Sequence, residues 1–363
     1  MEDNIKISKG KKVLDFVIKT MNGMAYGLFS TLIVGTILAT IGGFFNDNSY
    51  VGKILVTVAK FLQNMTGVGI GLGIAWSLKL DGLKLICATI SGGIASYFSS
   101  FRLWEIFKVV DYDYFETNAK FQIGDPLSIY LVVIFTVLLI TTVLKQKTPV
   151  DIILIPLFAV VASLILSMII CGPVSALTTL IGRFVNSATV LQPFLMGIVI
   201  SVVMGMALTA PISSAAIAVA IGLEGLAGGA AVVGCCVQML GFAVMSRKDN
   251  SIGMVISTAI GTIMLQFKNI LKKPIIWLPT IIVSAILGPI GTCLFKIQCN
   301  SAGAGMGTSG LVGYFGTIDA MGGIANSWVV ILVLLFILPV VLVYILDLVF
   351  RKFNLIKQDD LRV

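Results

Sequence analysis

The chain has 363 residues, of which 58% are hydrophobic and only 12% are charged, with a net charge of +8. Soluble domains carry about 25% charged residues, so half that share cannot cover a globule of this size with polar surface. Composition therefore excludes a soluble protein and indicates an integral membrane protein that binds no nucleic acid, since its basic residues stand between apolar runs.

Apolar runs long enough to cross a bilayer follow one another along the chain. A membrane helix needs about 20 such residues. The runs of that length are 22–45, 51–78, 83–101, 127–145, 151–171, 193–210, 229–245, 274–296 and 326–350. The predicted fold class is all-α, a polytopic membrane protein with about 9–10 transmembrane helices.

Three shorter or glycine-broken apolar stretches are predicted to be re-entrant or unwound. They are residues 211–228, 251–266 and 300–323. Helices in lipid tolerate such breaks only where protein or a water-filled cavity satisfies the freed backbone groups.

Lysine and arginine predict how the chain is oriented. Both termini are basic, and so are the loops at 145–147, 247–248 and 268–273, whereas segment 102–126 is acidic. With the basic loops and both termini in the cytoplasm, 251–266 must enter the membrane and return to the cytoplasmic side. Segment 297–325 must do the same from outside.

The predicted organisation is one transmembrane domain, 21–350, between a basic segment, 1–20, and a cytoplasmic tail, 351–363. An internal repeat is visible, because YGLFSTLIVGTIL (26–38) aligns with MGIVISVVMGMAL (196–208) and pairs Gly27 with Gly197 and Gly35 with Gly205. Two related halves, about 21–171 and 190–350, are a common transporter plan with solute bound at the midplane. Chance recurrence of small residues is the alternative.

Polar groups inside apolar runs are costly, so each is a candidate for function. Glu224 stands in a long apolar run and is predicted to face the protein interior; alternatively it ends a short loop at the membrane edge. Gln238 suits a sugar hydroxyl, although a hydrogen bond to a neighbouring helix explains it equally well. In LTAPISSAA, Pro211 removes a backbone donor, as in a broken helix that lines a site.

The glycine cluster AGAGMGTSG (302–310) contains G-x-G-x-x-G, the fingerprint of dinucleotide-binding turns. That fingerprint requires a strand before it and a helix after it, and apolar membrane runs flank this one instead. The cluster is interpreted as a re-entrant loop that lines a cavity, with a close-packed helix seam as the alternative.

The predicted solute-binding residues combine these segments. They are Glu224, Gln238, Thr209, Ser213, Ser214, Asn300, Thr308, Ser309 and Asp125. Asp125 precedes Pro126 and also suits a helix N-cap. No catalytic residue, metal site or cofactor is predicted, because histidine is absent and the six cysteines show no C-x-x-C spacing.

Four runs of the sequence resemble the enzyme IIC-like membrane proteins of the bacterial sugar phosphotransferase system, in the branch that includes the perfringolysin O regulator-type proteins. The runs are TPVDIILIPL (148–157), LQPFLMGIVISVVMGMALTAPISSAAIA (191–218), GLAGGAAVVGCCVQMLGFAVMS (225–246) and AGAGMGTSGLVG (302–313). The resemblance implies a homodimeric permease in the bacterial plasma membrane, whose sugar a separate IIB protein phosphorylates. The chain has no histidine and no appended IIA or IIB domain, so phosphotransfer would require separate partners.

The leading hypothesis is a IIC-like permease for a small polar solute, with a sugar as the first candidate. The second is a membrane-embedded sensor or regulator of gene expression that keeps the fold without transport. An intramembrane enzyme is the weakest reading, because Cys, Asp and Glu stand at unsuggestive spacings.

Overall fold

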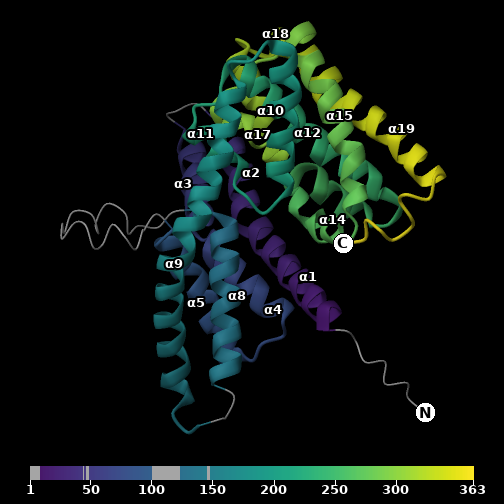
Figure 1. Ribbon diagram of the computed structural model, residues 1–363. Helices are drawn as coiled ribbons and strands as arrows, with labels where there is room; N and C mark the ends of the chain where they lie inside the picture. Colours follow the sequence, from purple (N-terminus) through teal and green to yellow (C-terminus); the bar gives the residue numbers. More distant parts are fainter. Residues whose placement is uncertain (1–8, 44, 46–48, 100–122, 145–147) are drawn as a thin grey trace. The chain divides into compact units, whose positions relative to one another are not determined.

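The computed structural model describes residues 9–43, 45, 49–99, 123–144 and 148–363, and the regular elements in them are helical (Figure 1). The longer helices are α1 (Lys9–Leu28), α2 (Val34–Gly42), α3 (Tyr50–Asn64), α4 (Thr66–Ser77), α5 (Gly82–Tyr97), α8 (Pro126–Val143), α9 (Asp151–Ala188), α10 (Pro193–Thr209), α11 (Ser214–Ala220), α12 (Gly225–Met245), α15 (Leu278–Pro289), α17 (Val312–Ala320) and α19 (Leu338–Lys352).

The membrane-protein class is confirmed. In the described residues, six helices are long and apolar enough to cross a membrane: Asp15–Gly42, Pro126–Val143, Asp151–Ala188, Gly225–Lys248, Pro274–Phe295 and Ile324–Lys352. The bent pair α3 and α4 makes a seventh if it is counted as one span. Two further predicted spans coincide with α5 and α10, which have 16 and 17 residues.

Two helices differ from the predicted ranges. Helix α1 begins at Lys9, well inside the predicted 1–20 segment, because Ile18, Met21 and Ala25 recur at helical spacing and are buried. Helix α9 runs 38 residues to Ala188, through Gly172 and Pro173, well past the end of the predicted span 151–171. Membrane helices tolerate proline when neighbours satisfy the freed carbonyl. Most of the acidic segment 102–126 and the lysine loop 145–147 lie outside the described residues.

The described chain forms two compact units. Unit 1 takes its residues from Met1–Thr31, Asn64–Gly124 and Ser128–Gly172, and unit 2 takes its residues from Leu32–Gln63, Asp125–Leu127 and Pro173–Val363. Residues 32–63 thus belong with the second part of the chain, so the units do not follow the predicted halves. The internal repeat stays a prediction.

Unit 1 is held together by a glycine seam on both sides of α4. A Cβ added to Gly27 of α1 would overlap the backbone of Gly69, and one added to Gly67 would overlap the backbone of Gly92 in α5. The sequence GVGIGLG therefore lets two helices approach α4 at backbone contact, as small residues do in membrane helix pairs.

We expect Gly67→Val to destabilise unit 1, because its side chain has no room between α4 and α5. Overpacking of this kind costs about 1–3 kcal/mol. The matched control is Gly82→Val, since a Cβ at Gly82 meets no atom within 4 Å. Thermal unfolding in detergent should show a lower midpoint for Gly67→Val alone; equal midpoints would contradict the seam.

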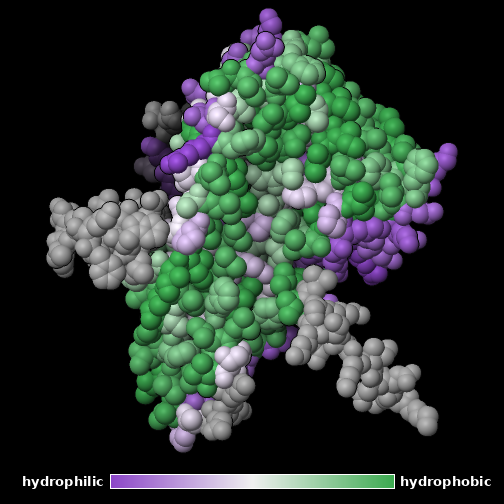
Figure 2. Space-filling view, in the orientation of Figure 1, coloured by the Kyte–Doolittle hydropathy of each residue, from purple (hydrophilic) through white to green (hydrophobic). Residues whose placement is uncertain are grey.

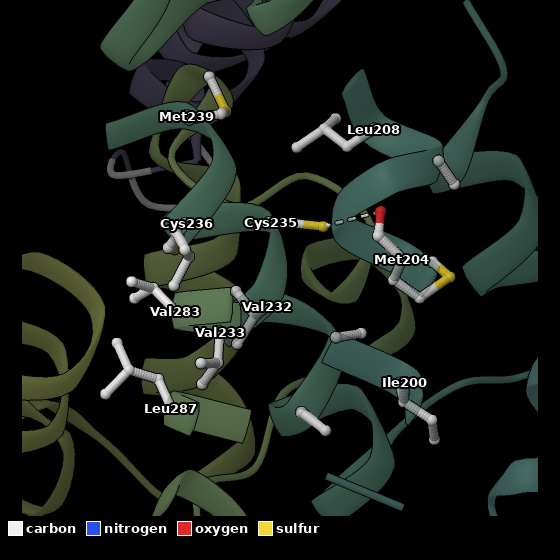
Figure 3. Packing of buried hydrophobic residues seen from close by; sticks show 14 of the residues in the cluster. Ile200, Met204, Leu208, Val232, Val233, Cys235, Cys236, Met239, Val283 and Leu287 are labelled. Carbon is white, nitrogen blue, oxygen red and sulfur yellow. Dashed lines mark hydrogen bonds between the residues drawn. The ribbon is translucent and has the colours of Figure 1, made fainter. Parts of the chain in front are cut away.

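The core of unit 2 lies where α10, α12 and α15 pack together (Figure 3). Figure 3 shows Met204 and Leu208 of α10 and Val283 of α15 around the buried residues of α12. Gly205 of α10 faces Gly234 of α12 so closely that an added Cβ would lie 2.8 Å from the Gly234 carbonyl oxygen. This contact fixes α12 at the centre of the unit.

The outward surfaces of several helices are apolar. Exposed large hydrophobic residues include Ile152, Leu157, Val161, Ile165 and Ile169 of α9 and Val341, Ile345 and Leu348 of α19. Figure 2 shows the hydrophobic colour over both helices. Surface of this kind matches contact with lipid tails.

Candidate functional site

Segment 252–272, called hairpin A, turns back on itself, so that its two ends lie close together. It comprises α13 (Ile252–Ile256), a π-helical turn (Ser257–Gly261), a 3-10 turn (Ile263–Gln266) and α14 (Phe267–Lys272). The chain breaks at Thr262, which is extended. The side-chain amides of Asn250 and Gln266 both donate to the Leu361 carbonyl, at 2.7 and 3.0 Å. The two ends of the segment therefore lie side by side, as predicted for a re-entrant segment.

Segment 299–320, called hairpin B, has the same plan. It comprises α16 (Ser301–Ala304), a turn, a short 3-10 helix (Ser309–Leu311) and α17. The Asn300 backbone N–H donates to the Gly316 carbonyl at 3.2 Å. The Asn300 side-chain amide donates to Asp319 Oδ2 at 2.9 Å. Hairpin B therefore also returns to where it starts.

The two hairpins approach α12 from opposite ends. The base of hairpin B pairs with the start of α12, because the Cys299 N–H donates to the Gly225 carbonyl at 3.1 Å. Hairpin A follows the other end of α12 after the turn Ser246–Lys248. With 21 residues, α12 is about 31 Å long, close to the thickness of a bilayer core.

The tips of the hairpins meet beside the middle of α12. Ser309 Oγ donates to the Gly261 carbonyl at 2.8 Å, and Thr308 Oγ1 donates to the Ala259 carbonyl. Gly307 rests against the backbone of Cys235, which a Cβ at Gly307 would approach to 2.7 Å. Two backbone carbonyls at the tip of hairpin A thus accept hydrogen bonds from side chains of hairpin B, and irregular backbone within a membrane requires such partners.

The glycine cluster 302–310 combines both predicted readings. It is an irregular turn between short helices, and Gly307 and Gly310 have left-handed φ values of 55° and 53°. It is also closely packed: a Cβ at Gly305 would lie 2.5 Å from the Ser214 carbonyl oxygen. Glycine is required here for turn conformation and for close approach.

Gln238 and Thr209 lie in the core near the tips. Gln238 Oε1 accepts hydrogen bonds from Thr209 at 3.3 Å, from Trp277 at 3.1 Å and from Thr280 at 2.8 Å. This arrangement matches the alternative in which Gln238 joins neighbouring helices. In the described residues its Nε2 is buried without a partner, which leaves a donor unused.

Ser213, Ser214 and Asp125 surround the break after α10. Ser213 Oγ caps α11 by accepting from the Ala216 N–H at 3.3 Å. Ser214 Oγ donates to the Gly305 carbonyl at 2.6 Å and so joins the break to hairpin B. Asp125 Oδ1 accepts from the Ser213 N–H at 3.4 Å. The break after α10 therefore lies against hairpin B.

The prediction that Glu224 faces the protein interior is wrong. Its side chain is exposed and makes no capping hydrogen bond at the start of α12, instead of facing the interior. Cys235, which contacts the loop 302–310, stands 11 residues further along the helix, or about 16 Å. Glu224 therefore does not share one compact pocket with Gln238 and Thr308. The turn between α11 and α12 holds it at the edge.

A pocket of about 310 Å³ lies between α2 and hairpin B. Its lining residues are Thr40, Gly43, Asn300, Ala302, Val312, Phe315, Gly316 and Asp319. Asn300 is fixed within it, because its Oδ1 accepts from the Gly303 N–H at 2.9 Å while its amide donates to Asp319. Thr36, one turn before Thr40, contacts Gly310, so α2 runs from this pocket to the hairpin tips.

Sequence reasoning missed Asp319, Thr40 and Phe315 as lining residues. Asp319 stands in the apolar stretch around GTIDAMGG and satisfies the criterion that selected Glu224. Thr40 and Phe315 carry no comparable signal, because only the folding of hairpin B against α2 brings them to Asn300.

Long apolar helices and two opposed hairpins define a polytopic helical membrane protein. A family model described as "Phosphotransferase system, EIIC" matches residues 18–363, and the chain belongs to that family. A comparison with curated proteins gave no match. Membership of the regulator-type branch stays a prediction.

Proposed function

We propose that the protein carries a sugar across the membrane, with the pocket beside hairpin B as its binding site. The pocket carries this proposal: it combines a carboxylate, an amide and a hydroxyl with an aromatic residue in a chain of the EIIC family. Pockets with a few placed polar groups among apolar walls are typical of small-molecule sites.

Asp319 and Asn300 supply the polar contacts in this proposal. Because the Gly303 N–H and the Asp319 carboxylate already hold the Asn300 amide, a sugar hydroxyl meets groups that need little reordering. Asp319 is exposed to the pocket and accepts from hydroxyl donors, and Phe315 offers an apolar surface to the C–H face of a sugar ring. Charge-assisted hydrogen bonds are the strong ones at such sites.

The remaining predicted residues have a different part. Thr308, Ser309 and Ser214 join hairpin B to hairpin A and to the break after α10, so they are proposed to form the closed end of the pathway. The solute passes when these contacts break and form again. Separate IIB and IIA proteins phosphorylate it in the cytoplasm, and the homodimer remains part of the same proposal.

We expect Asp319→Asn to weaken sugar binding roughly 10- to 100-fold, because a hydrogen bond to a charged group contributes about 1.5–3 kcal/mol. The variant keeps the acceptor for Asn300, so folding is preserved. Titration calorimetry of the purified protein against a panel of sugars measures the Kd, and uptake into proteoliposomes measures transport.

The control is Asp15→Asn, an exposed residue of α1 with the same change in charge, which should leave binding and uptake unchanged. Equal affinities for both variants would remove Asp319 from the site. Binding without uptake by the wild-type protein would favour a sensor over a permease.

A further inference from the structure

A second pocket, of about 400 Å³, lies where the segment after α19 returns to the base of hairpin A. We call it the basic pocket; its lining residues are Lys268, Asn269, Lys272, Lys273, Asp359, Asp360, Arg362 and Val363. Figure 2 shows the hydrophilic colour gathered beside α14 and the C-terminus. Four of the lining side chains are basic and two are acidic.

The acidic side chains are already engaged by two of the basic ones. Asp360 Oδ2 lies 2.6 Å from Lys273 Nζ and also accepts from the Lys357 backbone N–H at 2.6 Å. Asp359 pairs with Arg362 at 3.6 Å. These pairs leave Lys268 and Lys272 without a carboxylate partner within ion-pair distance in the described residues.

Lys268 is the unusual member of this set. Its side chain is only 7% exposed, and in the described part of the chain no hydrogen-bond acceptor is assigned to its ammonium group. A buried lysine is costly unless it is paired. The charge of Lys272 adds repulsion rather than compensation.

We propose that the basic pocket binds a phosphate group, held by the ammonium groups of Lys268 and Lys272. An anion there supplies the acceptor that Lys268 lacks and offsets the repulsion between the two lysines. The inference is independent of sugar transport through the pocket beside hairpin B.

The bound phosphate group has a structural consequence. The tail is already fastened to hairpin A and its approach, because Asn269 donates to the Arg362 carbonyl at 3.1 Å and the Val363 N–H donates to Asn250 at 2.8 Å. A phosphate group held there lies between the base of hairpin A and the tail, both of which line the pocket, and a ligand that binds only the folded protein raises its stability. Binding therefore stabilises the base of hairpin A.

The test uses the full chain in phosphatidylcholine nanodiscs, with inorganic phosphate as the probe. Thermal unfolding followed by tryptophan fluorescence should show a phosphate-dependent rise in midpoint for the wild type. Lys268→Met should raise the phosphate Kd about tenfold or more, since a charge-assisted contact is lost. Lys272→Met, which changes an exposed side chain, should raise the Kd as well.

The matched control is Lys357→Met, which removes an exposed tail lysine outside the basic pocket and should respond like the wild type. A second arm replaces inorganic phosphate with phosphatidylglycerol in the nanodisc. If the unfolding midpoint rises with the lipid but not with inorganic phosphate, and Lys268→Met removes the rise, the phosphate group belongs to a lipid headgroup. No rise in either arm, or equal responses from Lys268→Met and Lys357→Met, would overturn the proposal.

The pH dependence of binding gives a separate readout. Burial, and then the charge of Lys272, lower the pKa of Lys268 to about 8. Lys268 therefore loses its charge as the pH rises through about 8, and binding of sulfate, whose charge stays constant in this range, should weaken there. The other charged side chains that line the pocket are Lys272, Lys273, Arg362, Asp359 and Asp360. Lys268→Met should abolish this pH-dependent weakening of sulfate binding. An unchanged pH dependence would contradict the role of Lys268.

Discussion

Gly307→Ala is expected to separate the two hairpin tips and to abolish sugar uptake. Gly307 has a φ of 55°, and a Cβ there would lie 2.7 Å from the backbone of Cys235. Left-handed strain costs about 1–2 kcal/mol and overpacking about 1–3 kcal/mol. Together they predict a loss of roughly 2–5 kcal/mol in the free energy of unfolding, measured by titration with a denaturing detergent in mixed micelles.

Gly222→Ala separates these two causes. Gly222 has a similar φ of 60°, but a Cβ there meets no atom within 4 Å. It should therefore lose only the strain contribution and should keep transport. Equal losses for both variants would show that the contact between Gly307 and α12 contributes nothing.

Asp347→Ala is expected to cost about 3–5 kcal/mol, the effect of removing one partner from a buried ion pair. The Asp347 carboxylate is fully buried, and it accepts from Arg351 Nε at 2.9 Å and from Arg247 Nη1 at 3.2 Å. Its loss leaves two guanidinium groups without their shared carboxylate where α12 and α19 end. Detergent-induced unfolding measures the change.

The comparison for Asp347 is Asp359→Ala, since the Asp359–Arg362 pair is mostly exposed, at 60% and 71%. Exposed pairs contribute at most about 1 kcal/mol, so this variant should unfold close to the wild type. A loss for Asp347→Ala no larger than that of Asp359→Ala would mean that the buried charges do not join α12 to α19.

The re-entrant hairpins were predictable because loops rich in lysine and arginine lie on the cytoplasmic side of the membrane. Keeping the residues around 247 and 268 on one side forces 251–266 to turn back, and the glycines of 302–310 mark a second irregular segment. The meeting of the tips was not predictable. Thr308 and Ser309 bind the carbonyls of Ala259 and Gly261, and backbone acceptors leave no trace in a sequence.

The candidate site shows a different limit. Glu224 was selected because it is an isolated acid in an apolar run, yet the structure leaves it exposed at the start of α12. Asp319 meets the same criterion and reaches Asn300 only because α17 returns alongside it. The packing of the tail against hairpin A was not predicted, because the apolar residues of the tail, among them the buried Ile356 and Leu361, show no helical or strand periodicity.

The arrangement of the two hairpins is tested most directly by labelling from each side of the membrane. Lys248→Cys marks the approach to hairpin A, and Ala302→Cys marks hairpin B; both residues are exposed. The background is Cys293→Ser, because the other five cysteines are buried. An impermeant maleimide should label Lys248→Cys only in inside-out vesicles and Ala302→Cys only in intact cells. Labelling of both residues from the same side would contradict hairpins that enter from opposite faces and meet beside the middle of α12.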